Sequence, residues 1–419
     1  MSLKKAVIAG YDAISPLGTD MEIQWKNAVL GKSGIKELTR FPFDNDFPVR
    51  IAGQVDEIDT SIYPFLSPRA LALWPSPIFK YAMLTVHRAL EKSKIEIDSK
   101  LAPRVAITFS SAVGGQGVLL NADRRMISEK KLPPPLANPN SCINMVGGKI
   151  SILTGATGPI FASITACATG LTSLITGAMI LEQGRADVAI CGAVDFALVE
   201  PIVAGFATMN GAYSHKPGIN ESPKQASRPF SSNRRGFVIS EGSGAVILTT
   251  KEFAKAHGLT QEIELAGWSM TSDARHFVAP NYETVKRCIA ESISDAGISP
   301  DDIDAVNAHA TSTKIGDKVE YDALKAIFKD NLPPVSANKS MTGHAMGASS
   351  AIESIFAVTG MLNNILLPTI NYTPDPKMEP GMELDCVSEG ARKLDQEFVL
   401  KNAFGFGGCN SCVIFRRIK

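Results

Sequence analysis

Short runs of apolar, β-branched residues alternate with helical patterns along almost the whole chain. Residues 105–109, 186–191, 244–249, 305–308 and 412–415 are typical of buried strands, and residues 6–10 predict a first strand near the start. Helical periodicity marks residues 78–92, 171–183, 282–296 and 318–328 between them. Because strands and helices that alternate in this way pack into layers, the pattern predicts an α/β fold with buried sheets.

A unit of strand, small-residue turn and buried helix occurs around Cys167 and again around His309, which suggests a duplicated architecture. The polar, helix-like stretch 251–260 is interpreted as the connector between the halves. We therefore divide the chain into residues 1–255 and 256–419. The first half is longer, and its Pro-rich segments 40–75 and 121–139 are expected to be irregular insertions.

Charge and composition exclude several classes of protein. The 419 residues carry 42 Lys plus Arg and 42 Asp plus Glu, and this balance argues against a general nucleic-acid binder. Seven sparse cysteines, mostly in apolar runs, favour reduced thiols in a cytoplasmic protein. The uncharged stretch 150–181 is interrupted by glycines and a proline, so we expect a strand and a buried helix there and no membrane span.

Cys167 lies between an apolar, strand-like run at 159–164 and a long apolar helical pattern. A cysteine at such a junction is near a helix N-terminus, where the helix dipole stabilises a thiolate and lowers the thiol pKa. A thiolate is a strong nucleophile for acyl groups. The alternative is a small buried core residue, so the position of Cys167 alone leaves both interpretations open.

Two of the six histidines and one glycine-rich segment have unusual settings. His309 follows the expected strand 305–308, and His344 precedes a helical segment that carries Glu353. Loops at strand ends often carry function, although a structural histidine is the alternative for each. Three glycines within residues 404–408 indicate a backbone that approaches another group closely. The two phenylalanines of that segment suggest a pocket wall, and a tight hairpin turn is the alternative.

Four motifs together resemble one family. They are Thr165-Ala-Cys-Ala-Thr-Gly170, His309-Ala-Thr-Ser-Thr313, Asn338-Lys-Ser-Met-Thr-Gly-His344 and Phe404-Gly-Phe-Gly-Gly-Cys-Asn410. Their order and spacing are similar to those of β-ketoacyl-acyl carrier protein synthases, in particular the elongating, Cys-His-His type of condensing enzyme. The resemblance covers residues from about 5 to 416. It implies a thiolase-like, duplicated five-layer αβαβα fold.

The resemblance also implies an acyltransferase that performs a decarboxylative Claisen condensation. An acyl group carried on Cys167 would be extended by two carbons from malonyl-acyl carrier protein, in fatty acid synthesis or in related polyene or polyketide synthesis. The substrates would arrive on the phosphopantetheine of the acyl carrier protein, and no cofactor or metal of the enzyme itself is implied. We expect a homodimer, with a heterodimer as the alternative.

Roles for individual residues follow from the same resemblance. Backbone N–H groups of Cys167 and Phe404 would form the oxyanion hole, and Phe404 with Gly405 would gate the malonyl side. His309 and His344 would donate hydrogen bonds from Nε2 to the malonyl enolate, which requires neutral imidazoles. Lys339 would place a fixed positive charge near His344, and Glu353 would orient that lysine. Thr311 and Thr313 would bind the pantetheine, and Val113 would shape the acyl pocket.

Carrier proteins are acidic, so a neutral enzyme needs a local basic patch to dock one. The candidates are Arg69, Arg124, Arg125, Lys130 and Lys131, for which ordinary solvated charge is the alternative.

Several positions depart from the usual pattern of the family: Ala310, Ser231, Arg235, Asp195, Ser240 and Cys409. None of them removes a catalytic group, but they favour a specialised pathway. A thiolase and a non-catalytic chain-length-type partner subunit remain alternatives, and a non-enzymatic binding module is disfavoured. The spacing of Cys409 and Cys412 also permits a redox or zinc site, which the lack of a second such pair disfavours.

Overall fold

The centre of the molecule is a nine-stranded mixed sheet, seen in a computed structural model that describes residues 5–216, 218, 221–374 and 382–418. Its strand order is β4 (Val105–Ser110), β5 (Val188–Phe196), β6 (Glu241–Thr250), β1 (Ala6–Ile14), β7 (Ile263–Ser272), β13 (Cys409–Arg417), β12 (Phe398–Gly405), β8 (Ala305–Asn307) and β9 (Val335–Ser336). The first four strands come from the first half of the chain, and the other five come from the second half.

The two halves of this sheet are joined at one point. Strands β1 and β7 run antiparallel and pair at Val7 and Glu264, whereas β1 pairs with β6 over most of its length. Within each half the pairing is mixed, for example parallel between β4 and β5 and antiparallel between β5 and β6. The assembly therefore consists of two half-sheets that share one hydrogen-bonded seam.

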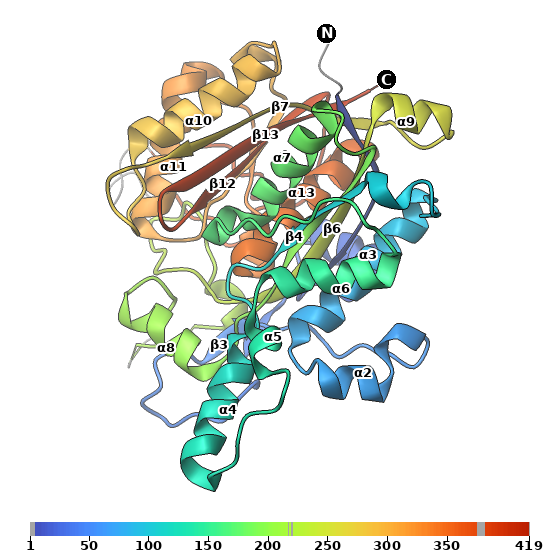
Figure 1. The fold of residues 1–419 in the computed structure, drawn as a ribbon. Coiled ribbons are helices and arrows are strands. Elements are labelled where there is room, and N and C mark those ends of the chain that lie inside the picture. The colour runs from blue at the N-terminus through green and yellow to red at the C-terminus, as the bar shows by residue number, and fades with distance from the viewer. Residues whose placement is uncertain (1–4, 217, 219–220, 375–381, 419) are drawn as a thin grey trace.

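Helices form three layers around these half-sheets (Figure 1). The first half-sheet is covered on its outer face by α3 (Pro77–Ser93) and α6 (Asn144–Thr154), and the second by α10 (Tyr282–Asp295), which packs on α11 (Lys314–Phe328). The helices α7 (Thr169–Glu182) and α13 (Met346–Asn363) lie between the half-sheets and contact both. This arrangement confirms the expected thiolase-like five-layer αβαβα fold.

The middle layer explains the apolar character of its sequence. Every residue of α13 from Met346 to Met361 is buried, and Glu353 is the charged residue among them. A helix covered on all sides cannot carry a solvated face, so its residues are almost uniformly small or apolar. The uncharged stretch that includes α7 is such a buried helix. Within the described part of the chain, no helix has the length and apolar character needed to cross a membrane.

The remaining elements lie around this core. They are α1 (Met21–Val29), the paired β2 (Ile35–Glu37) and β3 (Ile51–Gly53), α2 (Pro68–Leu73), α4 (Gln116–Glu129), α5 (Ala137–Ser141), α8 (Glu200–Thr208), α9 (Lys251–Ala256), α12 (Lys339–Thr342), and the paired β10 (Ile365–Leu366) and β11 (Arg392–Lys393). In Figure 1, α4, α5 and α8 lie at the end of the molecule opposite the two termini.

The expected strands and helices are present, with boundaries that differ by a few residues. Two local predictions were wrong. Residues 159–164 form no strand, because the segment is tied to β4 by a single bridge between Ile160 and Ile107. The expected irregular insertions are partly regular, because residues 121–129 belong to α4 and residues 40–75 contain β3 and α2. The division at residue 255 remains a prediction, since strands from both sides of it share one sheet.

Candidate active site

Cys167 is held at the junction between the two buried middle helices. It lies in a single 3₁₀ turn, Ala166–Ala168, that leads directly into α7, and Ala166 has a φ of 48°. The Thr169 hydroxyl donates to the Ala166 carbonyl at 2.7 Å and accepts the Thr165 N–H at 3.0 Å, which closes the turn. A Cβ on Gly170 would lie 2.5 Å from the backbone nitrogen of Ala351, so glycine lets α7 approach α13 closely.

Two histidines from the other half of the chain complete the site. His344 Nε2 lies 3.0 Å from Cys167 Sγ, and the rings of His309 and His344 meet edge to face with centroids 5.9 Å apart. His309 follows β8, and His344 precedes α13. All three side chains are more than nine-tenths buried. The structure therefore brings together the three residues that the sequence motifs separate by up to 177 positions.

The hydroxyl of Ser349, a residue that the sequence analysis did not single out, lies beside Nδ1 of His344. Ser349 Oγ accepts the N–H of Ala345 at 2.8 Å and lies 3.1 Å from His344 Nδ1. The hydroxyl proton of Ser349 can then be donated to Nδ1, which leaves the ring proton on Nε2. In this arrangement the Nε2–H group of His344 is aimed at the sulfur of Cys167.

Burial controls the protonation of all three groups. It lowers the pKa of His309 and His344 well below the usual histidine range, and the positive charges of Lys339 and Lys401 lower it further. Both effects favour the neutral imidazole, which is the form expected for the two donors. The expectation for Cys167 was wrong: burial raises its pKa to about 12, although Lys339 acts in the opposite direction. Desolvation of the thiolate outweighs the favourable position at the helix N-terminus.

A network of buried charges lies behind the histidines. Lys339 Nζ donates to Glu353 Oε1 at 2.6 Å and to the carbonyl of His309 at 2.7 Å. The second carboxylate oxygen, Glu353 Oε2, accepts from Lys401 Nζ at 2.7 Å. The expected contact between Lys339 and Glu353 is thus present, while Lys401 was missed. Its signal in the sequence was a lysine in the middle of the apolar run of β12.

Glu320 fixes the backbone that carries His309. Its carboxylate accepts the N–H groups of His309 at 2.8 Å and Ala310 at 2.7 Å, and also the side-chain amide of Asn402 at 3.0 Å. Ala310 is not among the residues with positive φ. Ala310, one of the departures from the family pattern, therefore introduces no left-handed backbone and leaves the support of His309 in place.

The glycine-rich segment after β12 approaches Cys167 closely, as its composition indicated. A Cβ on Gly405 would lie 2.3 Å from the carbonyl oxygen of Thr165. The backbone N–H groups of Phe406 and of Cys167 itself interact with the Cys167 sulfur. Phe406 lies two residues beyond Phe404, whose N–H was expected in the oxyanion hole. The ring of Phe404 instead packs edge-on against His309, with centroids 5.7 Å apart. Phe406 packs on the same apolar cluster as Val113.

The remaining expected binding residues surround this centre. Thr311 and Thr313 lie after His309, with their hydroxyl oxygens 3.0 Å apart. The loop that carries Val113 is anchored by Asp195, which accepts the Val113 N–H at 2.9 Å and the Ser111 hydroxyl at 2.6 Å. Burial raises the pKa of Asp195 to about 6. Asp195, one of the departures from the family pattern, thus supports the loop that is expected to shape the acyl pocket.

The other departures have local partners. The Ser231 hydroxyl donates to the carbonyl of Asn371 at 2.9 Å, and Ser240 donates to that of Thr342 at 2.7 Å. Arg235 donates to Glu221 at 2.8 Å. Cys409 and Cys412 are both free thiols on β13, and the described residues contain no group of three side chains suited to a metal. The redox or zinc interpretation gains no support.

The expected basic docking residues lie on or near α2 and α4, and most pair with acidic residues of the chain itself. Arg124 pairs with Glu200 at 3.0 Å, and Glu129 accepts from Lys131 at 2.8 Å and approaches Arg125 at 3.5 Å. Arg69 and Lys130 are exposed, and neither forms an ion pair with the described residues. The structure does not gather all five residues into one unpaired patch.

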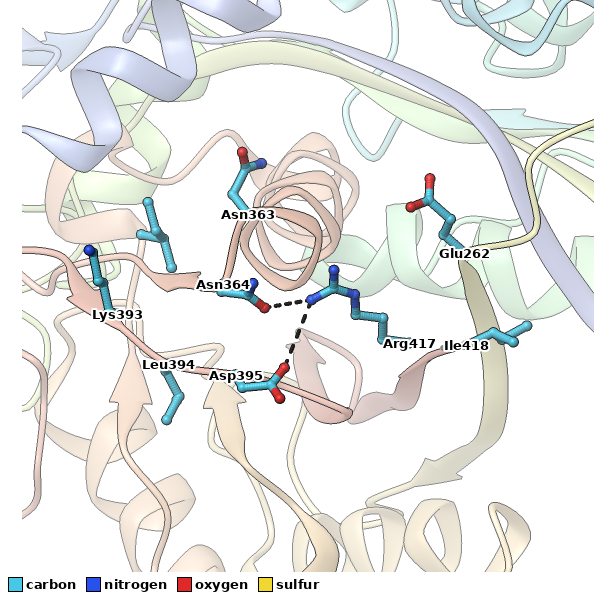
Figure 2. Close-up of a pocket in the computed structure, with 9 residues that line it drawn as sticks. Glu262, Asn363, Asn364, Lys393, Leu394, Asp395, Arg417 and Ile418 are labelled. Atoms are coloured by element: carbon cyan, nitrogen blue, oxygen red, sulfur yellow. Dashed lines mark hydrogen bonds and ion pairs between the residues drawn. The ribbon is translucent and has the colours of Figure 1, made fainter.

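A surface cleft of about 950 Å³ lies at the other end of α13 (Figure 2). It is lined by Glu262, Asn363, Asn364, Ile365, Lys393, Leu394, Asp395, Arg417 and Ile418. Arg417 crosses it and interacts with Asn364 and Asp395. An 18-residue helix is about 27 Å long, and His344 lies at its opposite end, so this cleft is separate from the cysteine and histidines.

A cysteine at the start of one central helix, with two neutral histidines and a buried lysine from the other half, defines a condensing acyltransferase of the thiolase-like class. Comparison with family models agrees: "Beta-ketoacyl synthase, N-terminal domain" matches residues 4–254, and "Beta-ketoacyl synthase, C-terminal domain" matches residues 263–373. The chain belongs to the beta-ketoacyl synthase family, as the motifs predicted.

Individual relatives resemble the chain over its full length. It is 35% identical over 425 residues to a 3-oxoacyl-[acyl-carrier-protein] synthase 2 of Coxiella burnetii, with 100% of both chains covered. A ketosynthase structure in complex with a type II PKS acyl-carrier protein matches at TM-score 0.89 and 25% identity, again over 100% of both chains. The ishigamide ketosynthase/chain length factor matches at TM-score 0.89 and 27% identity with the same coverage.

Proposed function

We propose that this chain extends carrier-bound acyl groups by decarboxylative condensation with malonyl-acyl carrier protein. The observation that carries this proposal is the 3.0 Å approach of His344 Nε2 to Cys167 Sγ, with His309 beside it and buried lysines behind. A nucleophile, two neutral donors and a dry pocket are what acyl transfer followed by enolate formation requires. The relative from Coxiella burnetii, a 3-oxoacyl-[acyl-carrier-protein] synthase 2, supports it.

The first half-reaction transfers the acyl group to Cys167. The sulfur of Cys167 attacks the thioester carbonyl, a new carbon–sulfur bond forms, and the bond to the pantetheine sulfur breaks. The proton of the Cys167 thiol leaves with the pantetheine thiol. The Nε2–H of His344 stabilises the sulfur as it gains negative charge, which offsets the desolvation that raises its pKa.

The second half-reaction condenses the acyl group with malonyl-carrier protein. The malonyl carbon–carboxylate bond breaks, carbon dioxide leaves, and the electron pair forms an enolate on the thioester oxygen. Neutral Nε2–H groups of His309 and His344 stabilise that oxygen. The carbanion attacks the acyl carbonyl, the bond to the Cys167 sulfur breaks, and the released thiolate takes up a proton from solvent. The product is longer by two carbons.

We assign the oxyanion hole for the acyl group to the backbone N–H groups of Cys167 and Phe406, and place Phe406 rather than Phe404 beside Gly405 in the gate. The interaction of Phe406 N–H with the sulfur supports this assignment. Thr311 and Thr313 bind the pantetheine, and Val113 limits the acyl pocket. The substrates bring the phosphopantetheine, and the enzyme uses no cofactor of its own.

The partners follow from the substrates. The enzyme docks an acyl carrier protein, acts in the cytoplasm and forms a homodimer. The solved complexes of similar ketosynthases with a carrier protein and with a chain length factor support the first of these and make a heterodimer the alternative assembly. The basic residues near α2 and α4 supply the docking charge.

Mass spectrometry after incubation with acyl-carrier proteins of varied chain length tests the proposal. We expect the mass of Cys167 to increase by that of the acyl group, and the proposal fails if no acyl group is ever found there. A Cys167→Gln variant is expected to decarboxylate malonyl-carrier protein without condensing it. Loading by unusual acyl groups alone would identify a specialised pathway, and loading by ordinary saturated chains would identify fatty acid synthesis.

The alternative is a chain-length-type subunit that assists an active partner, and the match to a ketosynthase/chain length factor structure favours testing it. Such a subunit needs no nucleophile, whereas this chain keeps Cys167 within hydrogen-bond distance of His344. A thiolase-related acyltransferase would condense two acyl groups without malonyl decarboxylation. Release of carbon dioxide by the isolated chain distinguishes the proposed synthase from both.

A further inference from the structure

Lys401 occupies an unusual place on β12. Its neighbours two positions away, Val399 and Ala403, belong to the apolar core that contains α13, because alternate residues of a strand share one face. Lys401 is 0% exposed. A buried ammonium group is costly unless it is paired and hydrogen-bonded, so a lysine on this face needs a specific compensation.

That compensation connects Lys401 to the catalytic centre. Its Nζ donates to Glu353 Oε2 at 2.7 Å and to the carbonyl of Asn402 at 2.8 Å. The other oxygen of Glu353 is held by Lys339, which also binds the carbonyl of His309. Asn402 in turn donates to Glu320, which accepts the N–H of His309. Lys401 therefore reaches the backbone of His309 by two routes.

Lys401 balances the charge of the buried groups around the two histidines. Lys339, Lys401, Glu320 and Glu353 are each at most 1% exposed, so two positive and two negative groups balance in a buried space. Without Lys401 the same space would hold one net negative charge beside His309 and His344. The substrate of the proposed reaction carries a carboxylate, and its transition state is an enolate. Both are destabilised by a negative charge at short range in a medium of low dielectric constant.

We infer that Lys401 is a positioning residue for the decarboxylation step, whose charge balances Glu353 and keeps the site of the histidine pair favourable for an anion. The inference rests on the proposed function and deepens it. It separates two lysines by role: Lys339 contacts the backbone of His309 directly, and Lys401 acts through Glu353 and Asn402.

The charged and titratable groups around the two histidines determine the expected pH dependence. They are Lys339 on α12, Glu353 on α13, Glu320 on α11, Lys401 on β12 and Cys167 before α7. Loss of the Lys401 charge removes one of the causes that lower the pKa of both histidines. The histidines would then take up protons at a higher pH, and a protonated imidazole at this site no longer matches the neutral donors that the reaction uses.

Malonyl-carrier protein decarboxylation by Lys401→Met, measured between pH 5 and 8, tests the inference. The acid limb of the pH profile is expected to move upward by about one unit, which lowers the rate about 10-fold on that limb. Lys401→Arg, which keeps the charge, is expected to retain the wild-type acid limb. An unchanged limb in Lys401→Met would overturn the inference, as would an equal shift in both variants.

Two controls separate this test from other failures. Lys92→Met removes a lysine from another buried carboxylate, Asp12, which it contacts at 2.6 Å on the far side of the first half-sheet. It is expected to reduce thermal stability without moving the acid limb, and a matching shift there would overturn the inference. Acyl loading of Cys167 in every variant reports on folding. If the wild-type chain neither loads nor decarboxylates, the proposed function itself fails.

Discussion

The charges around Glu353 and those around Glu129 show how differently one interaction behaves in two regions of the molecule. Glu353 holds Lys339 and Lys401 on its two oxygens, and all three side chains are at most 2% exposed. Glu129, at the end of α4, holds Lys131 at 2.8 Å and Arg125 at 3.5 Å, but these side chains are 41% to 63% exposed. Both regions contain one carboxylate between two cations.

Solvent makes the difference between them. An exposed ion pair exchanges its partners with water and salt, and its net contribution is small. A buried pair cannot, so removal of one member leaves an uncompensated charge. The buried charges around Glu353 can therefore hold a catalytic residue in place. The exposed charges around Glu129 leave their cations available to another acidic surface. The predictions below test this contrast.

Glu353→Gln should have the largest effect. It leaves two buried ammonium groups with only an amide between them, which we expect to cost roughly 3–5 kcal/mol of unfolding free energy. Condensation should fall by at least about 100-fold, because the backbone of His309 loses the fixed position of Lys339. Thermal unfolding and product formation measure the two effects. Glu129→Gln is the matched control, and a comparable loss in that variant would refute the contrast.

The buried histidines should make stability depend on pH. Burial lowers the pKa of His344, so the folded chain keeps it neutral while the unfolded chain protonates it below about 6.5. Stability is then lost as pH falls below that value, by at most about 1.4 kcal/mol per pH unit for one histidine. Buried carboxylates such as Asp195 have a raised pKa and act in the opposite direction. The comparison of wild type with His344→Gln cancels their contribution.

Denaturant unfolding between pH 5 and 7.5 measures this difference. We expect the wild type to lose stability relative to His344→Gln as the pH decreases. A constant difference across that range would show that the folded chain binds a proton at His344 as readily as the unfolded chain does. His87→Gln is the control, because His87 is partly exposed and lies 3.3 Å from Glu91 at the surface.

Ser349→Ala should have a smaller effect, because it removes neutral hydrogen bonds to Ala345 and His344 and no charge. Without the hydroxyl, His344 Nδ1 loses the donor that keeps the ring proton on Nε2. We expect malonyl decarboxylation to fall about 5- to 10-fold, in line with a net hydrogen-bond contribution of about 1 kcal/mol. Ser354→Ala is the control on the same helix, since that hydroxyl bonds the Ser350 carbonyl. Nitrogen NMR of His344 should show a mixture of tautomers in Ser349→Ala alone.

Much of the buried site could be predicted from the sequence, because each motif there has little freedom. The small residues after Cys167 and the glycine at 405 permit a close backbone approach. The contact of Lys339 with Glu353 was implied by the family resemblance. Ser349 could not be recognised, since a serine in a helix acquires meaning only through its neighbours across the fold. Lys401 stood out as a lysine in an apolar run, but the sequence does not show its partner Glu353. The lowered thiol pKa was wrong for the same reason: the sequence shows the helix but not the depth of burial.

The assignment at Phe404 illustrates a different limit. Two phenylalanines flank Gly405, and the sequence does not show which of their N–H groups reaches the sulfur. In the structure the β12 strand continues to Gly405, so Phe404 remains in the ladder opposite Asn410 and the turn that follows carries Phe406. The docking residues stay a prediction, because surface charge is tolerated almost anywhere and a basic side chain alone does not define a partner.

Lys130→Glu should have the smallest effect and should reveal the other side of the contrast. Lys130 ends α4, is exposed, and forms no ion pair with the described residues, so its charge is available to an acidic carrier protein. We expect KM for the carrier to rise about 3-fold at low salt and kcat to stay unchanged, because rim charges mainly affect encounter. The increase should disappear at high ionic strength. Lys100→Glu is the control and should leave KM unchanged. Lys100 is exposed and lies before the start of β4, whereas α4 follows the other end of that strand. Equal effects of the two variants would mean that the net charge of the enzyme attracts the carrier, rather than a docking surface at α4.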